Sequence, residues 1–180
     1  MTSRILSVCT ANVCRSPLVA ALLADRLDPA RYEVESAGVR AAPGRPMDRD
    51  SALQLVNRGL PIPTTTARQL TSDILAGADL VLTATKAHRA EVLDVYPRAL
   101  RRTFTVREFA ALSELVEADD LATLVKKAAD ARTKGPRVVD LTDPIGRPLQ
   151  VHEEVAALAD TATATIADRL NALGGPGAAG

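Results

Sequence analysis

Short apolar runs of strand length alternate with amphipathic helical patterns from the start of the chain. Residues 4–8 predict a strand, and residues 18–27 carry leucine and valine at four-residue spacing, which predicts a helix. Further strands are expected near 32–36, 79–83 and 102–105. This alternation favours a doubly wound parallel sheet, because each parallel crossover needs a helix that packs on one face of the sheet. The expected fold class is therefore α/β.

Capping residues, proline and glycine predict where the helices begin and end. Ser16 before Pro17 is a helix-start signal, because serine can accept a free backbone N–H and proline has none to leave unpaired. The other helices are expected at 48–58, from residue 71, and at 86–95, 106–112, 114–132 and 149–173. In the last helix the core-facing positions are expected to be Val151, Val155, Leu158, Ile166 and Leu170.

Length and composition exclude several classes of protein. The 180 residues suit one domain, expected at 1–173, with a disordered tail at 174–180. Lys and Arg total 22 against 22 Asp and Glu, so the zero net charge gives no electrostatic reason to bind nucleic acid or a membrane surface. No apolar run reaches the roughly 20 residues of a membrane span. Two cysteines make no disulfide framework, which favours a reducing, cytoplasmic location.

The loop after the first predicted strand carries residues that suggest chemistry. Cys9 and Arg15 are separated by five residues, between a strand and a helix. In an open α/β sheet this position brings backbone N–H groups and a helix N-terminus to one point, where they can bind a dianion. The Arg15 guanidinium can add two parallel donors, and this positive environment favours the thiolate of Cys9, to which Ser16 could donate its hydroxyl. A nucleophile inside an oxyanion cradle suits covalent phosphoryl transfer.

The segment Val8–Pro17, VCTANVCRSP, resembles the signature loop of the low-molecular-weight protein tyrosine phosphatases. The likeness extends in order and spacing to Ser36-Ala37-Gly38, Ala67–Thr71, Ala78–Leu82 and Asp143-Pro144. It implies a flavodoxin-like single domain with a four-stranded parallel sheet, no metal and no cofactor, that acts on a phosphorylated protein or a small phosphoester. The stretch 115–137 is longer than the resemblance predicts, so it is expected to be an extra helical segment.

The resemblance also implies roles for individual residues. Cys9 would be the nucleophile that forms a phosphocysteine intermediate, and Arg15 would clamp the phosphate. Asp143 would be the general acid, because a carboxyl on a loop facing the cradle can protonate the leaving oxygen and then activate water. Asp140 is the local competitor for this role. The other expected phosphate-binding or supporting residues are Thr10, Ala11, Asn12, Val13, Cys14, Ser16 and Ser36.

Within this loop, Asn12 and Cys14 carry further expectations. Asparagine tolerates a left-handed backbone better than most residues, so Asn12 is expected to shape the turn, with support from Ser36. The resemblance allows Cys14 to form a reversible disulfide with Cys9. The alternative is that Cys14 packs under the loop as a small residue, and the sequence leaves both readings open.

Several departures from the family pattern bear on the substrate. Ala11 stands where glycine is common, so its methyl group could crowd the phosphate. Ile145 follows Asp143-Pro144 where an aromatic residue is frequent, and the chain has only two Tyr, two Phe and no Trp, which removes stacking partners for a phenyl ring. Val13 favours tyrosine nonetheless, because relatives that act on phosphoarginine tend to have threonine there. Two further departures are Thr65, where histidine is frequent, and His152, where tyrosine is frequent. Arg40, Arg45 and Arg49 could add positive potential near the mouth of the site.

Four hypotheses about function follow. The first is a protein tyrosine phosphatase, and the second applies the same chemistry to a non-aromatic phosphoester such as a metabolite phosphate. The third is an arsenate reductase, which would need an external thiol because no cysteine follows Cys14. The fourth is a noncatalytic phosphate-binding module. His88 and His152 lie on predicted helices without partners at ligand spacing, so no metal site is expected.

Overall fold

Four parallel strands form a single sheet in the computed structural model, which describes residues 2–174. The tail expected at 174–180 therefore lies, apart from Gly174, outside the described residues. The strands are β1 (Ser3–Cys9), β2 (Tyr32–Gly38), β3 (Leu80–Thr83) and β4 (Thr103–Thr105). Their order is β2-β1-β3-β4, and Ile5 pairs with Val34 on one side and Leu80 on the other. The predicted four-stranded doubly wound sheet is confirmed.

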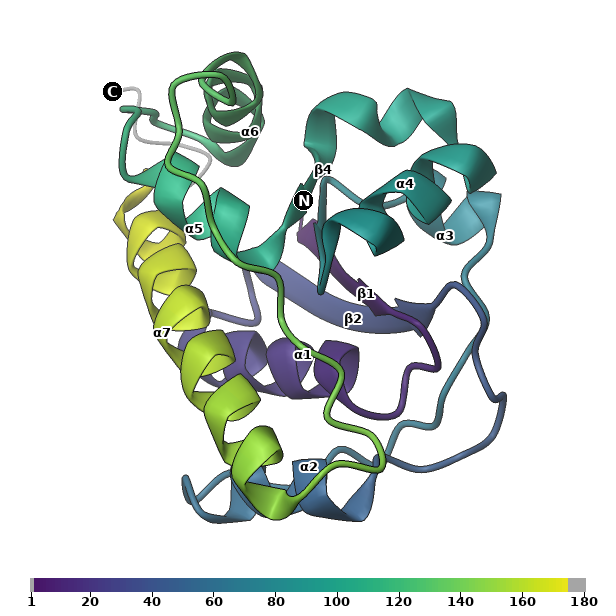
Figure 1. The fold of residues 1–180 in the computed structure, drawn as a ribbon. Coiled ribbons are helices and arrows are strands. Elements are labelled where there is room, and N and C mark those ends of the chain that lie inside the picture. Colours follow the sequence, from purple (N-terminus) through teal and green to yellow (C-terminus); the bar gives the residue numbers. More distant parts are fainter. Residues whose placement is uncertain (1, 175–180) are drawn as a thin grey trace.

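Helices cover both faces of the sheet. They are α1 (Arg15–Arg26), α2 (Arg49–Val56), α3 (Ser72–Ala76), α4 (Lys86–Val95), the 3₁₀ helix η1 (Pro97–Arg102), α5 (Val106–Ser113), α6 (Leu121–Asp130) and α7 (Leu149–Ala172). Figure 1 shows α1, α2, α5 and α7 on one side of the sheet and α3 and α4 on the other. The 3₁₀ helix was not predicted.

The apolar residues of the strands fall into two clusters, one on each face. On β1, Ile5 and Cys9 belong to the cluster shared with α1 and α7, whereas Leu6 and Val8 belong to the cluster that includes Leu75 of α3. Successive side chains of a strand point to opposite faces, which produces this division. Because both faces are covered, the carboxyl half of the central strand is buried on both sides, with Ile5, Leu6, Val8 and Cys9 as its apolar residues, and it gives the loop that follows a rigid base.

Two predicted helix starts are wrong. Helix α1 begins at Arg15, and its N-cap residue is Cys14, which makes no side-chain capping bond. Ser16 lies inside the helix, and its hydroxyl contacts the Cys9 sulfur and caps no backbone N–H. Residues 114–120 are not helical, since α6 begins at Leu121. Its N-cap is Asp120, whose carboxylate accepts the backbone N–H of Thr123 at 2.9 Å.

The expected core face of α7 is wrong at one position. Leu158 is 37% exposed, whereas Val155 and Ile166 are buried as expected. The buried stripe runs through Val155, Ala156 and Ala159, and residue 158 falls outside that stripe at 3.6 residues per turn.

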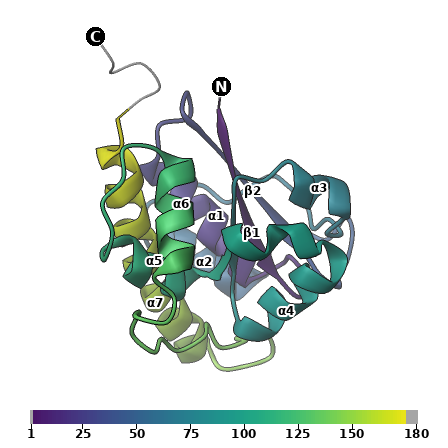
Figure 2. The same cartoon turned by 90° about the horizontal axis from the view of Figure 1, so that it is seen from above.

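The extra segment lies away from the loop that follows β1. Helix α6 packs against α5 and η1, and Figures 1 and 2 both show it beside α5. Its buried face is the predicted one, Leu121, Leu124, Val125 and Ala128. Among residues 2–174, no helix combines the length and apolar character that crossing a membrane requires.

Candidate active site

The loop between β1 and α1 turns through a left-handed residue. Asn12 has φ of 58° and is the only non-glycine residue with positive φ among residues 2–174. Asparagine adopts this region at lower cost than most side chains, as the sequence analysis expected. Ala11 lies outside this region, so the alanine that replaces the glycine common in the resembled family causes no backbone strain there.

The carbonyl groups of the loop are bonded to the chain around it. The acceptors are the carbonyls of Cys9, Thr10, Ala11 and Val13, which bind the N–H groups of residues 39, 40, 42 and 48 at 2.6–3.3 Å. In a trans peptide the N–H points opposite to the carbonyl, so the next N–H along the chain faces the inside of the loop. The backbone N–H groups of residues 10–14 have no acceptor among residues 2–174. The loop therefore presents a ring of free donors, which is an anion-binding geometry.

Gly38, the last residue of β2, allows the loop to pack this closely. A Cβ atom on Gly38 would lie 2.4 Å from the carbonyl oxygen of Thr10 and 2.9 Å from the nitrogen of Asn12. Both are backbone atoms that cannot move aside without reshaping the loop. Gly38 was predicted only as a strand end, and the Ser-Ala-Gly motif was the only signal of its importance.

A buried hydrogen-bond network leads from β2 to the Cys9 sulfur. The Asn12 amide donates to Ser16 Oγ and to Ser36 Oγ, both at 2.9 Å, and its oxygen accepts the backbone N–H of Arg68 at 3.0 Å. Since Ser16 Oγ accepts from Asn12, its own proton is free to be donated. Cys9 Sγ lies 3.0 Å from Ser16 Oγ, closer than the competing carbonyl of Ala37 at 3.4 Å. The network therefore places a hydroxyl donor on the sulfur.

Arg15 lies under the loop with one donor left unpaired. Its side chain is almost fully buried and donates to the carbonyl of Leu141 at 3.1 Å. A second nitrogen forms an ion pair with Asp143 at 3.2 Å. The buried Nε–H has no partner among residues 2–174, and an unpaired buried donor needs an acceptor from a ligand or water.

The structure separates the two candidate acids. Asp143 lines the same hollow as Cys9 and Arg15, and its side chain is 55% exposed. Asp140 instead accepts the backbone N–H of Lys86 at 3.2 Å, at the start of α4. Asp140 thus has a local structural partner, whereas Asp143 faces the loop.

His88 contacts the loop, which the sequence analysis missed. Its Nε2 lies 2.8 Å from Thr10 Oγ1 and its Nδ1 lies 2.9 Å from Thr85 Oγ1, the N-cap of α4. Burial lowers the pKa of His88, the charge of Arg15 lowers it further, and Glu91 and Asp143 act in the opposite direction. A neutral ring fits this position between two hydroxyl groups.

Cys14 takes part in a second polar cluster, separate from the hydrogen bonds of Cys9. Its Sγ lies 2.5 Å from Ser51 Oγ, which in turn lies 3.2 Å from Nδ1 of His152. Burial raises the pKa of Cys14 to about 12. Both cysteines are free thiols in this structure. The sequence shows no partner for His152 at ligand spacing, and the structure supplies partners that are distant in the chain, because α7 brings His152 to the loop and to the N-terminus of α2.

The loop lies at the bottom of a hollow of about 470 Å³. Met47 and Ile145 form part of its wall, and Arg45 and Arg49 are exposed beside it. Arg40, expected at the mouth, instead forms an ion pair with Glu91 of α4. The hollow thus combines a basic floor with a partly apolar wall.

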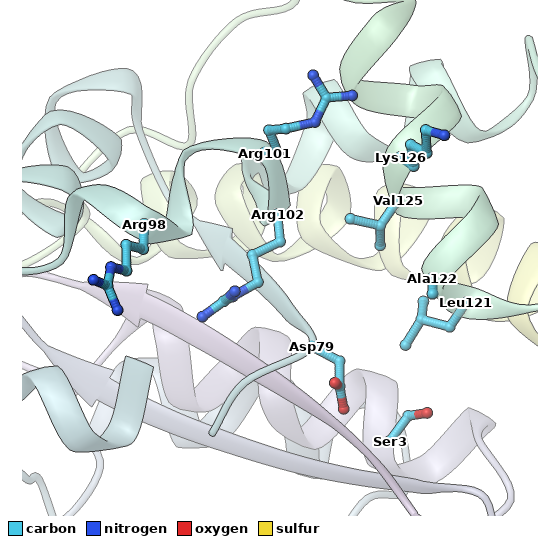
Figure 3. A pocket seen from close by; sticks show the side chains of 9 residues that line it. All are labelled: Ser3, Asp79, Arg98, Arg101, Arg102, Leu121, Ala122, Val125 and Lys126. Carbon is cyan, nitrogen blue, oxygen red and sulfur yellow. The ribbon is translucent and has the colours of Figure 1, made fainter. Parts of the chain in front are cut away.

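A second hollow, of about 270 Å³, lies at the opposite end of the strands, between η1 and α6. It is lined by four cationic residues, and Figure 3 shows their charged ends pointing in different directions. Arg101 pairs with Asp130 at 2.5 Å, and Arg102 donates to the carbonyl of Leu75 at 3.1 Å. These charges do not converge on one point.

Comparisons with known proteins give consistent matches. The family model described as low molecular weight phosphotyrosine protein phosphatase matches residues 4–124. A protein-arginine-phosphatase of Geobacillus stearothermophilus is 31% identical over 170 residues, covering 94% of this chain and 97% of that relative. The low molecular weight protein-tyrosine-phosphatase Etp of Escherichia coli K12 is 32% identical over 111 residues, covering 62% and 74%. A solved low molecular weight protein tyrosine phosphatase from T. tengcongensis is 28% identical with a TM-score of 0.73, covering 94% and 100%.

Proposed function

Because the chain belongs to the low molecular weight phosphotyrosine protein phosphatase family and is a phosphatase, we propose that it hydrolyses phosphotyrosine in proteins through a phosphocysteine at Cys9. One observation carries this proposal. The free N–H groups of residues 10–14, the unpaired Nε–H of Arg15 and the Cys9 sulfur all belong to one loop. A phosphate held by these donors would have its phosphorus next to the sulfur.

In the first step, the Cys9 thiolate attacks phosphorus and the bond from phosphorus to the leaving oxygen breaks. The proton of the Asp143 carboxyl goes to that oxygen, so the products are the alcohol, phosphocysteine and the Asp143 carboxylate. Asp143 is paired with Arg15 at 3.2 Å without substrate. A phosphate dianion would replace the carboxylate as the partner of Arg15 and free Asp143 to face the leaving group.

In the second step, Asp143 acts as a base. Its carboxylate takes a proton from water, the water oxygen attacks phosphorus, and the phosphorus–sulfur bond breaks. Cys9 leaves as the thiolate, which the Ser16 hydroxyl at 3.0 Å would stabilise by hydrogen bonding. Inorganic phosphate is released and Asp143 is again protonated. The cycle needs no cofactor, and it needs Cys9 reduced, as a cytoplasmic location would provide.

Phosphotyrosine is the favoured substrate because the walls of the hollow can take a ring. Val13 and Ile145 present aliphatic carbons there, and Ile145 is 46% exposed. Phosphoarginine is the second candidate, since the Geobacillus arginine phosphatase aligns over 97% of its length. Val13 and Ile145 offer a guanidinium group no hydrogen-bond acceptor, and the two carboxylates that line the hollow are engaged, Asp143 with Arg15 and Asp48 with the N–H of Ser51. We therefore rank phosphotyrosine above phosphoarginine.

A substrate panel tests the proposal. The protein is assayed with p-nitrophenyl phosphate, a phosphotyrosine peptide, a phosphoarginine peptide, an alkyl phosphate, and arsenate with an external thiol. We expect the phosphotyrosine peptide to give the highest kcat/KM. Cys9→Ser should abolish turnover, and rapid quenching of the wild type should yield phosphate on Cys9 by mass spectrometry. Turnover that survives in Cys9→Ser would overturn the mechanism. A higher kcat/KM for the phosphoarginine peptide or the alkyl phosphate than for the phosphotyrosine peptide would overturn the assignment of phosphotyrosine as the substrate.

A further inference from the structure

Three side chains with different metal-binding atoms meet beneath the catalytic loop. Cys14 Sγ, a carboxylate oxygen of Asp48 and a ring nitrogen of His152 all lie within 4.8 Å of one another. They come from the loop, from the N-cap of α2 and from α7. Cys14 and His152 are buried, and none of the three side chains takes part in the proposed hydrolysis, to which Cys14 contributes only its backbone N–H.

These donor types suit zinc. Zn²⁺ accepts thiolate sulfur, imidazole nitrogen and carboxylate oxygen in tetrahedral sites, with bonds of about 2.0–2.3 Å. Such bonds separate the ligand atoms by about 3.3–3.6 Å. His152 Nδ1 and Asp48 Oδ2 are already 3.7 Å apart, and the Cys14 sulfur lies within 4.8 Å of a donor atom of each residue, so an inward movement of the sulfur of roughly 1 Å completes three corners.

The surroundings can supply the remaining requirements of such a site. Ser51 Oγ lies 2.5 Å from Cys14 Sγ and 3.2 Å from His152 Nδ1, so its hydroxyl is placed to bind the ion or a bound water. Cys14 and Asp48 also line the hollow above the loop, which gives the ion a path from solvent. A site with three protein ligands and one open position is the usual form of a non-structural zinc site.

We propose that Cys14, Asp48 and His152 form a Zn²⁺ site whose occupation inhibits the phosphatase. On binding, the Cys14 thiol releases its proton to solvent and the sulfur bonds to zinc as thiolate, while the neutral His152 ring and the Asp48 carboxylate supply electron pairs. No oxidation or reduction is involved. Binding does not depend on the substrate of the enzyme.

Inhibition follows from how the site is joined to the loop. Cys14 immediately precedes Arg15, and the Asp48 N–H donates to the Val13 carbonyl at 2.6 Å. Drawing the sulfur toward His152 would shift the peptide groups on both sides of it. The ring of N–H donors and the Arg15 clamp would then fit a phosphate less well.

Spectroscopy with Co²⁺ as a zinc substitute tests the site without turnover, so its result is independent of the proposed function. The full chain is stripped with a chelator and titrated with Co²⁺. We expect one ion per chain, a thiolate-to-cobalt charge-transfer band, and the intense visible bands of tetrahedral cobalt. Zn²⁺ should displace the cobalt and, in a separate assay, slow p-nitrophenyl phosphate hydrolysis.

Variants identify the ligands. Cys14→Ser should remove the charge-transfer band, and His152→Gln should weaken Co²⁺ binding by about 100-fold, at the upper end of losses seen when metal sites lose a supporting partner. Asp48→Asn retains the α2 cap and gives a second test should His152→Gln fail to fold. Cys9→Ser and His88→Gln are the matched controls and should bind Co²⁺ as the wild type does.

Three results would overturn the proposal. The first is no one-to-one binding below millimolar Co²⁺. The second is a charge-transfer band that Cys9→Ser abolishes and Cys14→Ser retains, which would place the ion on the nucleophile. The third is unchanged binding in both Asp48→Asn and His152→Gln. Any of these would leave the cluster as a hydrogen-bond network that holds the loop.

Discussion

The two hollows at opposite ends of the strands differ in how their charges are arranged. At the carboxyl ends, buried Arg15 and the free N–H groups of residues 10–14 converge beside Cys9. At the amino ends, the hollow of Figure 3 has more cationic side chains, but Arg101 and Arg102 have partners elsewhere. Fixed donors that point to one place thus define a phosphate site. Flexible side chains on helices would lose conformational entropy if they were ordered around a phosphate, which weakens binding.

The largest effect is expected from Arg15→Lys. Lysine keeps the charge but loses the planar pair of donors, so kcat/KM should fall on the order of 10³-fold. Initial rates with p-nitrophenyl phosphate measure this. The matched change at the other hollow, Arg101→Lys, should leave kcat/KM within a factor of about two, because that guanidinium is exposed and paired only at the surface. Equal losses of kcat/KM in Arg15→Lys and Arg101→Lys would contradict the proposed difference between the two hollows.

The second largest effect is expected from Asp143→Asn, which should lower kcat/KM for an alkyl phosphate by about 10²-fold because the leaving oxygen is no longer protonated. The loss should be smaller on p-nitrophenyl phosphate, whose leaving group needs less protonation. Asp140→Asn is the control within the same loop, because asparagine can still accept the Lys86 N–H that Asp140 binds at 3.2 Å. If Asp140→Asn proves the more damaging change, the roles of the two acids are reversed.

Two glycine substitutions compare the packing of the two ends. In Gly38→Ala the new Cβ would meet Thr10 O at 2.4 Å, a backbone atom, so the free energy of unfolding should drop by about 1–3 kcal/mol. In Gly77→Ala it would meet Arg4 Nη1 at 2.5 Å, the far end of a flexible side chain that can move. Urea unfolding should therefore show almost no change for Gly77→Ala. Similar losses of unfolding free energy in the two variants would contradict this prediction, because they would mean that the loop can move to accommodate the new Cβ of Gly38→Ala.

The smallest effect is expected from His88 at mildly acidic pH. Burial, with Arg15, lowers the pKa of His88 below its ordinary 6.5, so below that pH the unfolded chain binds more protons than the folded one. The free energy of unfolding should therefore fall as the pH drops through 6.5 toward the lower folded pKa. His88→Gln should lose less stability over this window in urea unfolding at neutral and acidic pH. A steeper loss in the variant would contradict the sign.

Local patterns predicted most of the elements, and the failures have local causes. The C-x5-R loop, its strand and the late Asp-Pro pair were recognisable because each is a contiguous motif. Ser16 was misread as a cap because its hydroxyl bonds across the loop to Cys9 and Asn12. Leu158 was misplaced because four of the nine buried residues of α7 are alanines and two are polar, which leaves the hydrophobic pattern of the helix weak.

The sequence by itself determined the α/β alternation, the loop that carries Cys9 and Arg15, and the left-handed turn at Asn12, because these depend on residues close together in the chain. Only the tertiary structure decided which distant residues support the loop. Gly38 packs against it from β2, His88 bonds Thr10 across 78 positions, and His152 reaches Ser51 across 101. Such contacts depend on how the helices and strands pack in three dimensions, and no local spacing records that packing.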